Sequence, residues 1–363
     1  MLDIAGDARL FKELESWLRR TLAIDVDNVS FSRASNGFSA ETLFASARQR
    51  DGTVREIVLR LEQPGGEIFL DTDIADQART LQALAHHAIA VPPLLALEVD
   101  RAVIGRRFLA MERVVGRSFP QSPNYYANGW IKELDAAGRA VVWDNALSVL
   151  GRINRLTPSD GFAFIDRPLY GAAGIDQYLG WLRAWRMQAV GLRAHRVIDV
   201  ALDWLDANRP TGLPVNFIWG DSNPCNILFA DDLTVAAALD FEAAALGPAE
   251  VDLGWWFFLD NVRKKDRARL SGVPDRAGCI AIYEQALSRP AKAVDYFEIL
   301  GGVRMSLVIA RTTQRLIDSG LLPSTCKAAD ENPMAAALAG LIDIAPAPVG
   351  EDFLAFVRAV TGR

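Results

Sequence analysis

The segment from residue 216 to residue 242 reads NFIWGDSNPCNILFADDLTVAAALDFE. In it, Asp221 is followed by Asn226, an apolar stretch, a turn at Asp231-Asp232, a second apolar stretch and then Asp240. A polar turn between two β-prone stretches is typical of a hairpin. An aspartate, an asparagine five positions later and a second aspartate after a hairpin have the layout of a kinase catalytic loop followed by its metal-binding site.

Phosphoryl transfer accounts for the residue types at these positions. It needs a carboxylate that orients or deprotonates the attacking hydroxyl, and oxygen ligands for a Mg²⁺ ion that bridges the nucleotide phosphates. Asp221 suits the first role, and Asn226 and Asp240 suit the second. Each residue alone is a weak signal, because such spacings occur by chance and an aspartate at a strand end is commonly a cap. The order of the parts gives the interpretation its weight.

The residues before this segment predict a small β-rich lobe. Apolar residues at helical spacing predict one helix over residues 8–22 and another from Asp73 to about Ala88, which Pro92-Pro93 follows. The dipeptides Asn36-Gly37 and Asp51-Gly52 favour tight turns between strands. The predicted strands are Val29–Ala34, Glu41–Ala47, Val54–Leu61, Leu94–Val99 and Arg107–Glu112.

Beyond Gly116 the pattern becomes helical. Helices are expected around residues 140–156, 175–190, 195–207, 276–288 and 291–318, with one strand-rich segment at 215–241. The predicted fold class is therefore α+β, a two-lobed protein-kinase-like fold with a small antiparallel β-rich N-lobe and a large, mainly helical C-lobe. We place the N-lobe, which covers the nucleotide phosphates, at residues 1–113, and the C-lobe, with the catalytic loop, metal site and acceptor pocket, at 114–363. The Ala/Pro-rich stretch 335–348 is expected to be a loop between terminal helices.

The composition is that of a folded, enzyme-sized protein. The 363 residues are 50% hydrophobic and 23% charged, which allows a sizeable core. The net charge is −6 and the basic run Arg263-Lys264-Lys265 is short, so the electrostatic footprint of a nucleic-acid-binding protein is missing. Without a signal-peptide pattern or an apolar run of about 18 residues, we expect a cytoplasmic protein with no membrane partner. The oligomeric state stays open.

The cysteines and histidines argue against other enzyme classes. Three scattered cysteines without CxxC spacing fit reduced thiols better than a disulfide framework or a zinc site. Only three histidines are present, which weakens a Ser-His-Asp hydrolase or a histidine-ligated metalloenzyme.

Further motifs point to one family. Strand Ile57–Arg60 ends in a cation, Phe108–Arg113 has the pattern of a hinge, and Leu246–Leu253 follows the second aspartate. Together with Gly220-Asp221, these stretches resemble the aminoglycoside-phosphotransferase and choline-kinase-like family, nearest to the kinase-type domains associated with acyl-CoA dehydrogenases. The resemblance covers nearly the whole chain and is specific to the family, though not to a substrate.

The resemblance implies Mg²⁺-dependent transfer of the γ-phosphoryl group of ATP, or GTP, to a hydroxyl of a small molecule, for example a hydroxyacyl metabolite. Asp221 is the implied catalytic residue, and Asn226 and Asp240 are the implied metal ligands. Trp219 and Glu242 are expected to support the site. The implied nucleotide-binding residues are Ser35, Asn36, Gly37, Phe38, Ser39, Arg60, Gln77, Met111, Glu112 and Arg113.

The chain departs from the family pattern at several positions. Trp219 stands where members usually have a histidine, which we interpret as structural support for the loop. Arg60 replaces the lysine of protein kinases; arginine can bind phosphate in a bidentate way. The helix partner of this cation is expected to be Gln77, with Asp73 or Asp76 as alternatives.

Other interpretations remain open. The loss of the histidine and of an acidic partner at Gln77 also fits a nucleotide-binding pseudokinase with a regulatory role, and an aminoglycoside-modifying kinase is a further alternative. A protein kinase is less favoured because the interval from Asp240 to Asp252 is too short for an ordinary activation segment. Asp252 is expected to cap a buried helix, and Trp181 and Trp185 to pack in a core, with an acceptor pocket as the alternative.

Overall fold

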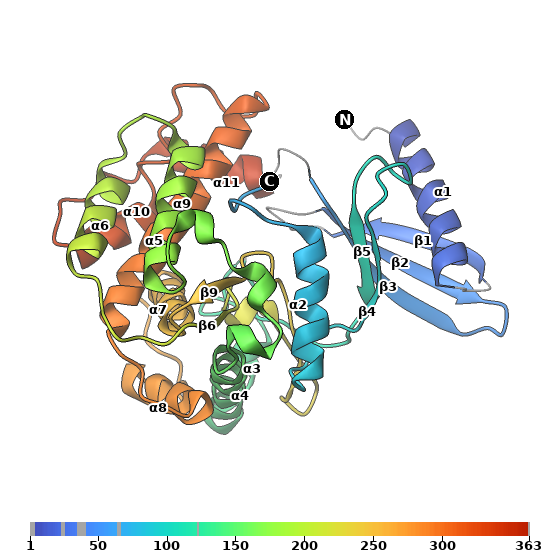
Figure 1. Cartoon of the computed structure of the whole chain (residues 1–363), viewed down its shortest axis with the longest axis horizontal. Coiled ribbons are helices and arrows are strands. Elements are labelled where there is room, and N and C mark those ends of the chain that lie inside the picture. The colour runs from blue at the N-terminus through green and yellow to red at the C-terminus, as the bar shows by residue number, and fades with distance from the viewer. Residues whose placement is uncertain (1–3, 23–25, 35–40, 64–66, 122, 362–363) are drawn as a thin grey trace.

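The computed structural model describes residues 4–22, 26–34, 41–63, 67–121 and 123–361. It has two lobes, a sheet covered by one helix and a larger helical lobe, with α2 lying between them (Figure 1). The helices are α1 (Ile4–Thr21), α2 (Ile74–His86), α3 (Trp130–Glu133), α4 (Ala136–Asn154), α5 (Ile175–Val190), α6 (Arg196–Ala207), α7 (Glu250–Lys264), α8 (Arg276–Leu287), α9 (Val294–Asp318), α10 (Pro333–Leu341) and α11 (Glu351–Thr361). The strands are β1 (Val26–Arg33), β2 (Glu41–Gln49), β3 (Val54–Leu61), β4 (Leu94–Glu98), β5 (Phe108–Glu112), β6 (Asn216–Ile218), β7 (Ile227–Phe229), β8 (Val235–Ala238) and β9 (Ala245–Gly247).

The N-lobe sheet has the order β1-β2-β3-β5-β4, and every neighbouring pair is antiparallel. The turn predicted at Asp51-Gly52 is confirmed: Gly52 has φ 86°, and the Asp51 carboxylate accepts from the Thr53 N–H at 2.9 Å. The turn predicted at Asn36-Gly37 lies outside the described residues. The observed lobes confirm the predicted α+β, protein-kinase-like fold class.

Helix α1 covers one face of this sheet. Leu14, Trp17 and Leu18 recur at helical spacing and are at most 1% exposed, in a cluster with residues of β2, β3 and β5. The Trp17 ring packs edge-on against Phe108 at 4.7 Å, and its indole N–H donates to Glu98 at 2.7 Å. Burial of each such apolar side chain contributes about 1.5–3 kcal/mol, so α1 is an integral part of the N-lobe.

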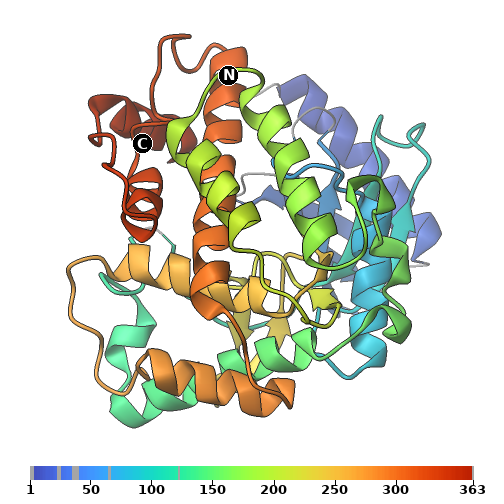
Figure 2. The same cartoon turned by 60° about the vertical axis from the view of Figure 1, so that its left-hand side comes forward.

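The C-lobe is organised around the crossing of α7 and α9. Helix α9 is the long orange helix that runs through the centre of this lobe, and α5 and α6 lie beside it (Figure 2). A Cβ on Gly254 of α7 would come within 2.1 Å of the Phe297 carbonyl carbon on α9, so the two backbones meet where only glycine fits. This close approach brings Trp255 and Arg304 to the same side of the crossing.

Residues 216–247 form two small antiparallel strand pairs. β7 and β8 pair antiparallel, as predicted, and β6 pairs with β9. The chain then enters α7 at Glu250, directly after β9, so no long segment separates Asp240 from this helix.

Residues 67–70 lie against the C-lobe. The indole N–H of Trp185 donates to the Ile68 carbonyl at 2.8 Å, and that of Trp181 to the Leu70 carbonyl at 3.2 Å. Trp181 is 4% exposed and Trp185 is wholly buried. Both tryptophans are therefore core residues that tie the segment after β3 to α5, as the packing interpretation expected.

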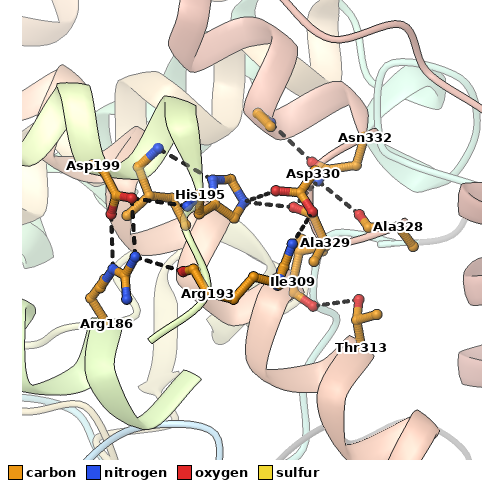
Figure 3. Close-up of polar contacts among 12 residues, drawn as sticks. Arg186, Arg193, His195, Asp199, Ile309, Thr313, Ala328, Ala329, Asp330 and Asn332 are labelled. Atoms are coloured by element: carbon orange, nitrogen blue, oxygen red, sulfur yellow. Dashed lines mark hydrogen bonds and ion pairs between the residues drawn. The ribbon is translucent and has the colours of Figure 1, made fainter. Parts of the chain in front are cut away.

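His195 joins the start of α6 to the segment before α10 (Figure 3). Its Nδ1 accepts from the Ile198 N–H at 3.4 Å, so the ring proton is assigned to Nε2, which donates to the Ala329 carbonyl at 2.9 Å. Asn332 caps α10 through the N–H groups of Met334 and Ala335. These contacts fix the C-terminal helices to the rest of the C-lobe.

The expectation of a loop over residues 335–348 is wrong for its first half, because α10 runs from Pro333 to Leu341. Asn332 at the N-cap and Pro333 at the first helical position both favour a helix start, and the alanines that follow favour its continuation. Among the described residues, no helix is both long and apolar enough to cross a membrane.

Candidate active site

The loop between β6 and β7 is held by backbone hydrogen bonds to one buried carboxylate. Asp252 accepts from the Trp219 N–H at 2.7 Å and from the Gly220 N–H at 2.9 Å, and its own carbonyl accepts from the Ser222 hydroxyl. Helix α7 begins after Ala249 without a side-chain cap, so the expectation that Asp252 caps it is wrong. Burial raises the pKa of Asp252, and these donors partly offset the shift. Asp252 therefore holds the loop between β6 and β7 and does not cap α7.

Gly220 is required by the path of this loop. It has φ 91°, and a Cβ there would lie 2.1 Å from the Ala243 carbonyl oxygen. The loop and the segment after β8 therefore approach each other backbone to backbone. This contact places Asp221 close to Asp240.

Asp221 is surrounded by hydrogen-bond donors. Its Oδ1 accepts from Asn223 Nδ2 and from the Trp255 indole N–H, both at 3.0 Å, and its Oδ2 accepts from Asn226 Nδ2 at 2.7 Å. Burial and the nearby charge of Asp240 raise the pKa of Asp221, and the bonds from Asn226 and Trp255 act in the opposite direction. A carboxylate held from three sides is oriented for contact with a substrate group.

Asn226 and Asp240 line the same cleft. Asn226 Nδ2 also donates to the Asp221 carbonyl at 3.0 Å, so its amide orientation is fixed and its Oδ1 is left as an acceptor. Asp240 is a non-glycine residue at φ 63°, a conformation that concentrates at functional sites. The side chains of both residues line a cavity of about 450 Å³ between the lobes.

Trp219 supports the backbone at Asp240. It is wholly buried, and its indole N–H donates to the Leu239 carbonyl at 2.8 Å and to the Asp240 carbonyl at 3.2 Å. Its ring stacks on Phe241 at 5.3 Å. The tryptophan that replaces the family histidine is thus a hydrogen-bonding and packing support for the strained residue.

Arg60 of β3 reaches the same point from the N-lobe. Its Nη2 lies 2.8 Å from Asp240 Oδ1 and 2.6 Å from Glu242 Oε2. Burial acts to lower the pKa of Arg60, but the charges of Asp240 and Glu242 outweigh it and the net shift is upward. In the described part of the chain Arg60 makes no bond to Gln77, and Asp73 caps α2 instead, so the expected helix partners are replaced by two carboxylates of the C-lobe.

The remaining nucleotide-binding candidates divide into two groups. Gln77, Met111, Glu112 and Arg113 all line the cavity together with Arg60 and Asp240. Ser35, Asn36, Gly37, Phe38 and Ser39 lie outside the described residues.

The hinge is tied to the rest of the N-lobe through its backbone and side chains. The N–H groups of Glu112 and Arg113 donate to the Pro93 and Glu56 carbonyls, at 2.9 and 3.0 Å. Arg55 donates to the Glu112 carboxylate at 2.6 Å. The N–H groups of Glu112 and Arg113 are therefore already bonded within the N-lobe.

Sequence reasoning missed three residues that contact the catalytic loop. Trp255 donates to Asp221, Asp252 holds the loop backbone, and wholly buried Arg304 donates from Nη2 to the Gly220 carbonyl at 2.6 Å. The Arg304 guanidinium also stacks on the Trp255 ring at 4.4 Å. The one available signal was a single arginine within the apolar stretch of residues 299–307.

The donor set fits a magnesium ion bound together with a nucleotide. Among the residues that the structure describes, no group of three or more His, Cys, Asp or Glu side chains could hold a metal alone. Mg²⁺ in nucleotide sites is usually bound by one or two carboxylates plus substrate phosphates. Asp240 and the Oδ1 of Asn226 supply such a partial set beside the cavity.

The fold is shared with solved structures of small-molecule kinases. A candidate aminoglycoside phosphotransferase from Ralstonia eutropha is 20% identical over 92% of this chain and 98% of that one, with a TM-score of 0.66. The choline kinase LicA from Streptococcus pneumoniae is 11% identical over 92% and 99%, with a TM-score of 0.54. Aminoglycoside phosphotransferase APH(4)-Ia, in a ternary complex with AMP-PNP and hygromycin B, is 14% identical over 97% and 100%, with a TM-score of 0.52.

Comparison with a protein-family model shows to which family the chain belongs. The model of the phosphotransferase enzyme family matches residues 30–289, which include β3, the hinge, the catalytic loop and α7. The chain therefore belongs to the phosphotransferase enzyme family.

Proposed function

We propose that this protein transfers the γ-phosphoryl group of ATP, or GTP, to a hydroxyl of a small molecule in a Mg²⁺-dependent reaction. The observation that carries the proposal is that Asn226 and Asp240 line a cavity of about 450 Å³ between the lobes, and that Asn226 also donates to Asp221 at 2.7 Å. The solved relative with AMP-PNP bound shares the fold.

The proposed roles follow from the geometry. The adenine or guanine base lies between apolar walls that include Val58 and Leu228, next to the hinge. Arg60 releases Asp240 and binds a phosphate oxygen, because a guanidinium exchanges one pair of oxygens for another at little geometric cost. When bound, Mg²⁺ neutralises charge on the phosphates; Asn226 and Asp240 are its proposed ligands.

Asp221 acts on the acceptor. One oxygen, Oδ1, already accepts two hydrogen bonds, whereas Oδ2 accepts one from Asn226 and retains capacity for the acceptor hydroxyl. The hydroxyl oxygen forms the new bond to the γ-phosphorus, its proton passes to Asp221, and the bond from that phosphorus to the β–γ bridging oxygen breaks to release the nucleoside diphosphate.

The acceptor proposed from the sequence resemblance is a hydroxylated metabolite such as a hydroxyacyl compound. The dehydrogenase-associated kinase domains provide the ground for this choice. Trp181 and Trp185 do not contribute to it, because both are buried under residues 67–70.

A pseudokinase is the alternative, since Trp219 and Gln77 depart from the family pattern. The hydrogen bonds from Trp219 to the backbone at Asp240 favour catalysis, because they give the loop a support without the histidine. The test is a screen of hydroxylated compounds for acceptor-dependent ADP release, with and without Mg²⁺. Turnover that needs both an acceptor and Mg²⁺ supports the enzyme; nucleotide binding without turnover on any compound supports the pseudokinase.

A further inference from the structure

Two arginines from different helices flank the catalytic loop. Arg304 of α9 donates to the Gly220 carbonyl, one residue before Asp221. Arg263, in the last turn of α7, lies over the Tyr125 ring at 5.7 Å and makes one long contact, 3.4 Å, with Asn223 Oδ1. Asn223 itself donates to Asp221. Each guanidinium group therefore contacts a residue that is bonded to, or next in sequence to, the proposed catalytic residue Asp221.

Much of the hydrogen-bonding capacity of these arginines is unused. Among the residues that the structure describes, no hydrogen-bond partner is found for three buried atoms, Arg304 Nε, Arg304 Nη1 and Arg263 Nη1. Neither arginine has a carboxylate within 4.0 Å in the described chain, in contrast to Arg60, which binds two. The charge of Arg304 acts to lower the pKa of Asp221 and of Asp252, but among the described residues neither carboxylate accepts a hydrogen bond from an arginine.

The nearest carboxylates are engaged elsewhere. Asp252 accepts from Asn154, Trp219 and Gly220, and Asp221 accepts from Asn223, Asn226 and Trp255. The positive charges on the acceptor side of the loop are therefore not neutralised by direct contacts. On the nucleotide side, Arg60 is in direct contact with two carboxylates, those of Asp240 and Glu242.

Burial distinguishes the two arginines. Arg304 is wholly buried behind the loop and stacks on Trp255, so it positions the loop and supplies a fixed positive charge. The Arg263 side chain is only partly buried, although its Nη1 is enclosed. A ligand that brings a negative charge beside Asp221 would meet Arg263 first.

We propose that the acceptor carries an anionic group, a carboxylate or a phosphate, that binds Arg263 while the reacting hydroxyl faces Asp221, with Arg304 as the second positive charge behind the loop. This inference rests on the proposed function and narrows it to acidic hydroxy compounds. A polycationic antibiotic would need carboxylates at this place and would meet guanidinium groups instead.

The test compares acceptors that differ in charge. 4-Hydroxybutyrate and glycerol 3-phosphate are the anionic probes, 4-hydroxybutyramide and glycerol are their neutral counterparts, and choline is the cationic probe. The two anionic probes separate a carboxylate site from a phosphate site. Turnover is followed as ADP release, and binding to the Mg²⁺–AMP-PNP complex is followed by calorimetry.

An arginine–anion hydrogen bond that is lost costs about 10- to 100-fold in affinity. We expect Arg263→Gln to raise the KM and Kd of the preferred anionic probe by about this factor, with kcat and nucleotide affinity nearly unchanged. Arg263→Lys should restore part of the loss. The matched control is Arg267→Gln, which removes the same charge from an exposed side chain just beyond α7 and should change neither value.

The outcomes are distinguishable. Preference for a neutral or cationic probe, or equal KM values in the parent and Arg263→Gln, would overturn the inference and leave the proposed function standing. Mg²⁺-dependent nucleotide binding without phosphorylation of any probe would count against the proposed function. In that case calorimetry still decides the anion site, and absence of anionic binding would overturn it.

Discussion

The two sides of the catalytic centre treat charge differently. On the nucleotide side, Arg60 of the N-lobe binds Asp240 and Glu242 of the C-lobe at 2.8 and 2.6 Å. On the acceptor side, Arg263 and Arg304 approach the loop without a carboxylate partner among the described residues, and three of their N–H-bearing nitrogens have no acceptor. The arginine on the nucleotide side is in contact with carboxylates, whereas the arginines on the acceptor side keep N–H groups for a ligand.

The two sides differ in what their charged groups contact. The Arg60 ion pairs join the two lobes and hold Asp240, the proposed metal ligand, in place. Asp221 lies at the boundary between the two sides, because the charge of Asp240 raises its pKa and that of Arg304 lowers it. Substitutions on the two sides should therefore affect different steps.

The largest effect on turnover is expected from a substitution of Asp221, which lies at the boundary between the two sides. Asp221→Asn keeps the hydrogen-bonding shape but removes the proton acceptor, so turnover should fall by about 100- to 10,000-fold. Nucleotide affinity should stay within about 2-fold, since the carboxylate acts on the acceptor. Steady-state kinetics and calorimetry measure both; normal turnover would remove Asp221 from its proposed role.

A substitution on the nucleotide side should act on binding. Asp240→Asn removes a proposed Mg²⁺ ligand and one partner of Arg60. In the parent, nucleotide should bind more tightly with Mg²⁺ than with a chelator, and the variant should lose about 10- to 100-fold of that advantage. Equal affinity of the parent with Mg²⁺ and with chelator would contradict the assigned metal site.

A change on the acceptor side should act on turnover and not on nucleotide binding. Trp255→Phe keeps a ring under Arg304 but removes the N–H that donates to Asp221 at 3.0 Å. The loss of one hydrogen bond to a charged group predicts a fall in kcat of about 10-fold, with the KM for nucleotide unchanged. An increase in the KM for nucleotide with unchanged kcat would contradict the assignment of Trp255 to the acceptor side.

The smallest effect on turnover is expected at Trp219. An imidazole N–H can take over the bond to the backbone at Asp240, so Trp219→His should lower kcat by about 3-fold at most. Its smaller ring leaves space beside Phe241, so the free energy of unfolding should fall by about 2–4 kcal/mol. Urea unfolding and kinetics on the same preparation separate the two effects.

Local patterns in the sequence predicted much of this molecule. Alternating strand patterns, turn dipeptides and helical periodicity predicted the N-lobe sheet and most C-lobe helices, because these signals are contained within short segments. Asp221, Asn226 and Asp240 were proposed as site residues from the same kind of local pattern, and the structure places Asn226 and Asp240 in the wall of one cavity. The helix α10 was missed because proline-rich neighbours masked a run of alanines that Asn332 caps.

Contacts between distant segments could not be predicted in this way. Asp252 accepts a hydrogen bond from the N–H of Gly220, which lies 32 residues earlier in the chain. Arg304 donates to the carbonyl of the same glycine, 84 residues earlier. Both reach the loop only because α7 and α9 cross closely at Gly254. The partners of Arg60 were missed likewise, since they come from the opposite lobe.

The most direct test of the central claim follows the γ-phosphoryl group itself. The protein is incubated with Mg²⁺, γ-labelled ATP and the panel of hydroxylated compounds, next to Asp221→Asn at matched nucleotide saturation. We predict label on an acidic hydroxy compound with the parent protein and a loss of at least about 100-fold with the variant. Absence of label on every compound despite saturating nucleotide, or equal labelling by the two proteins, would contradict the account.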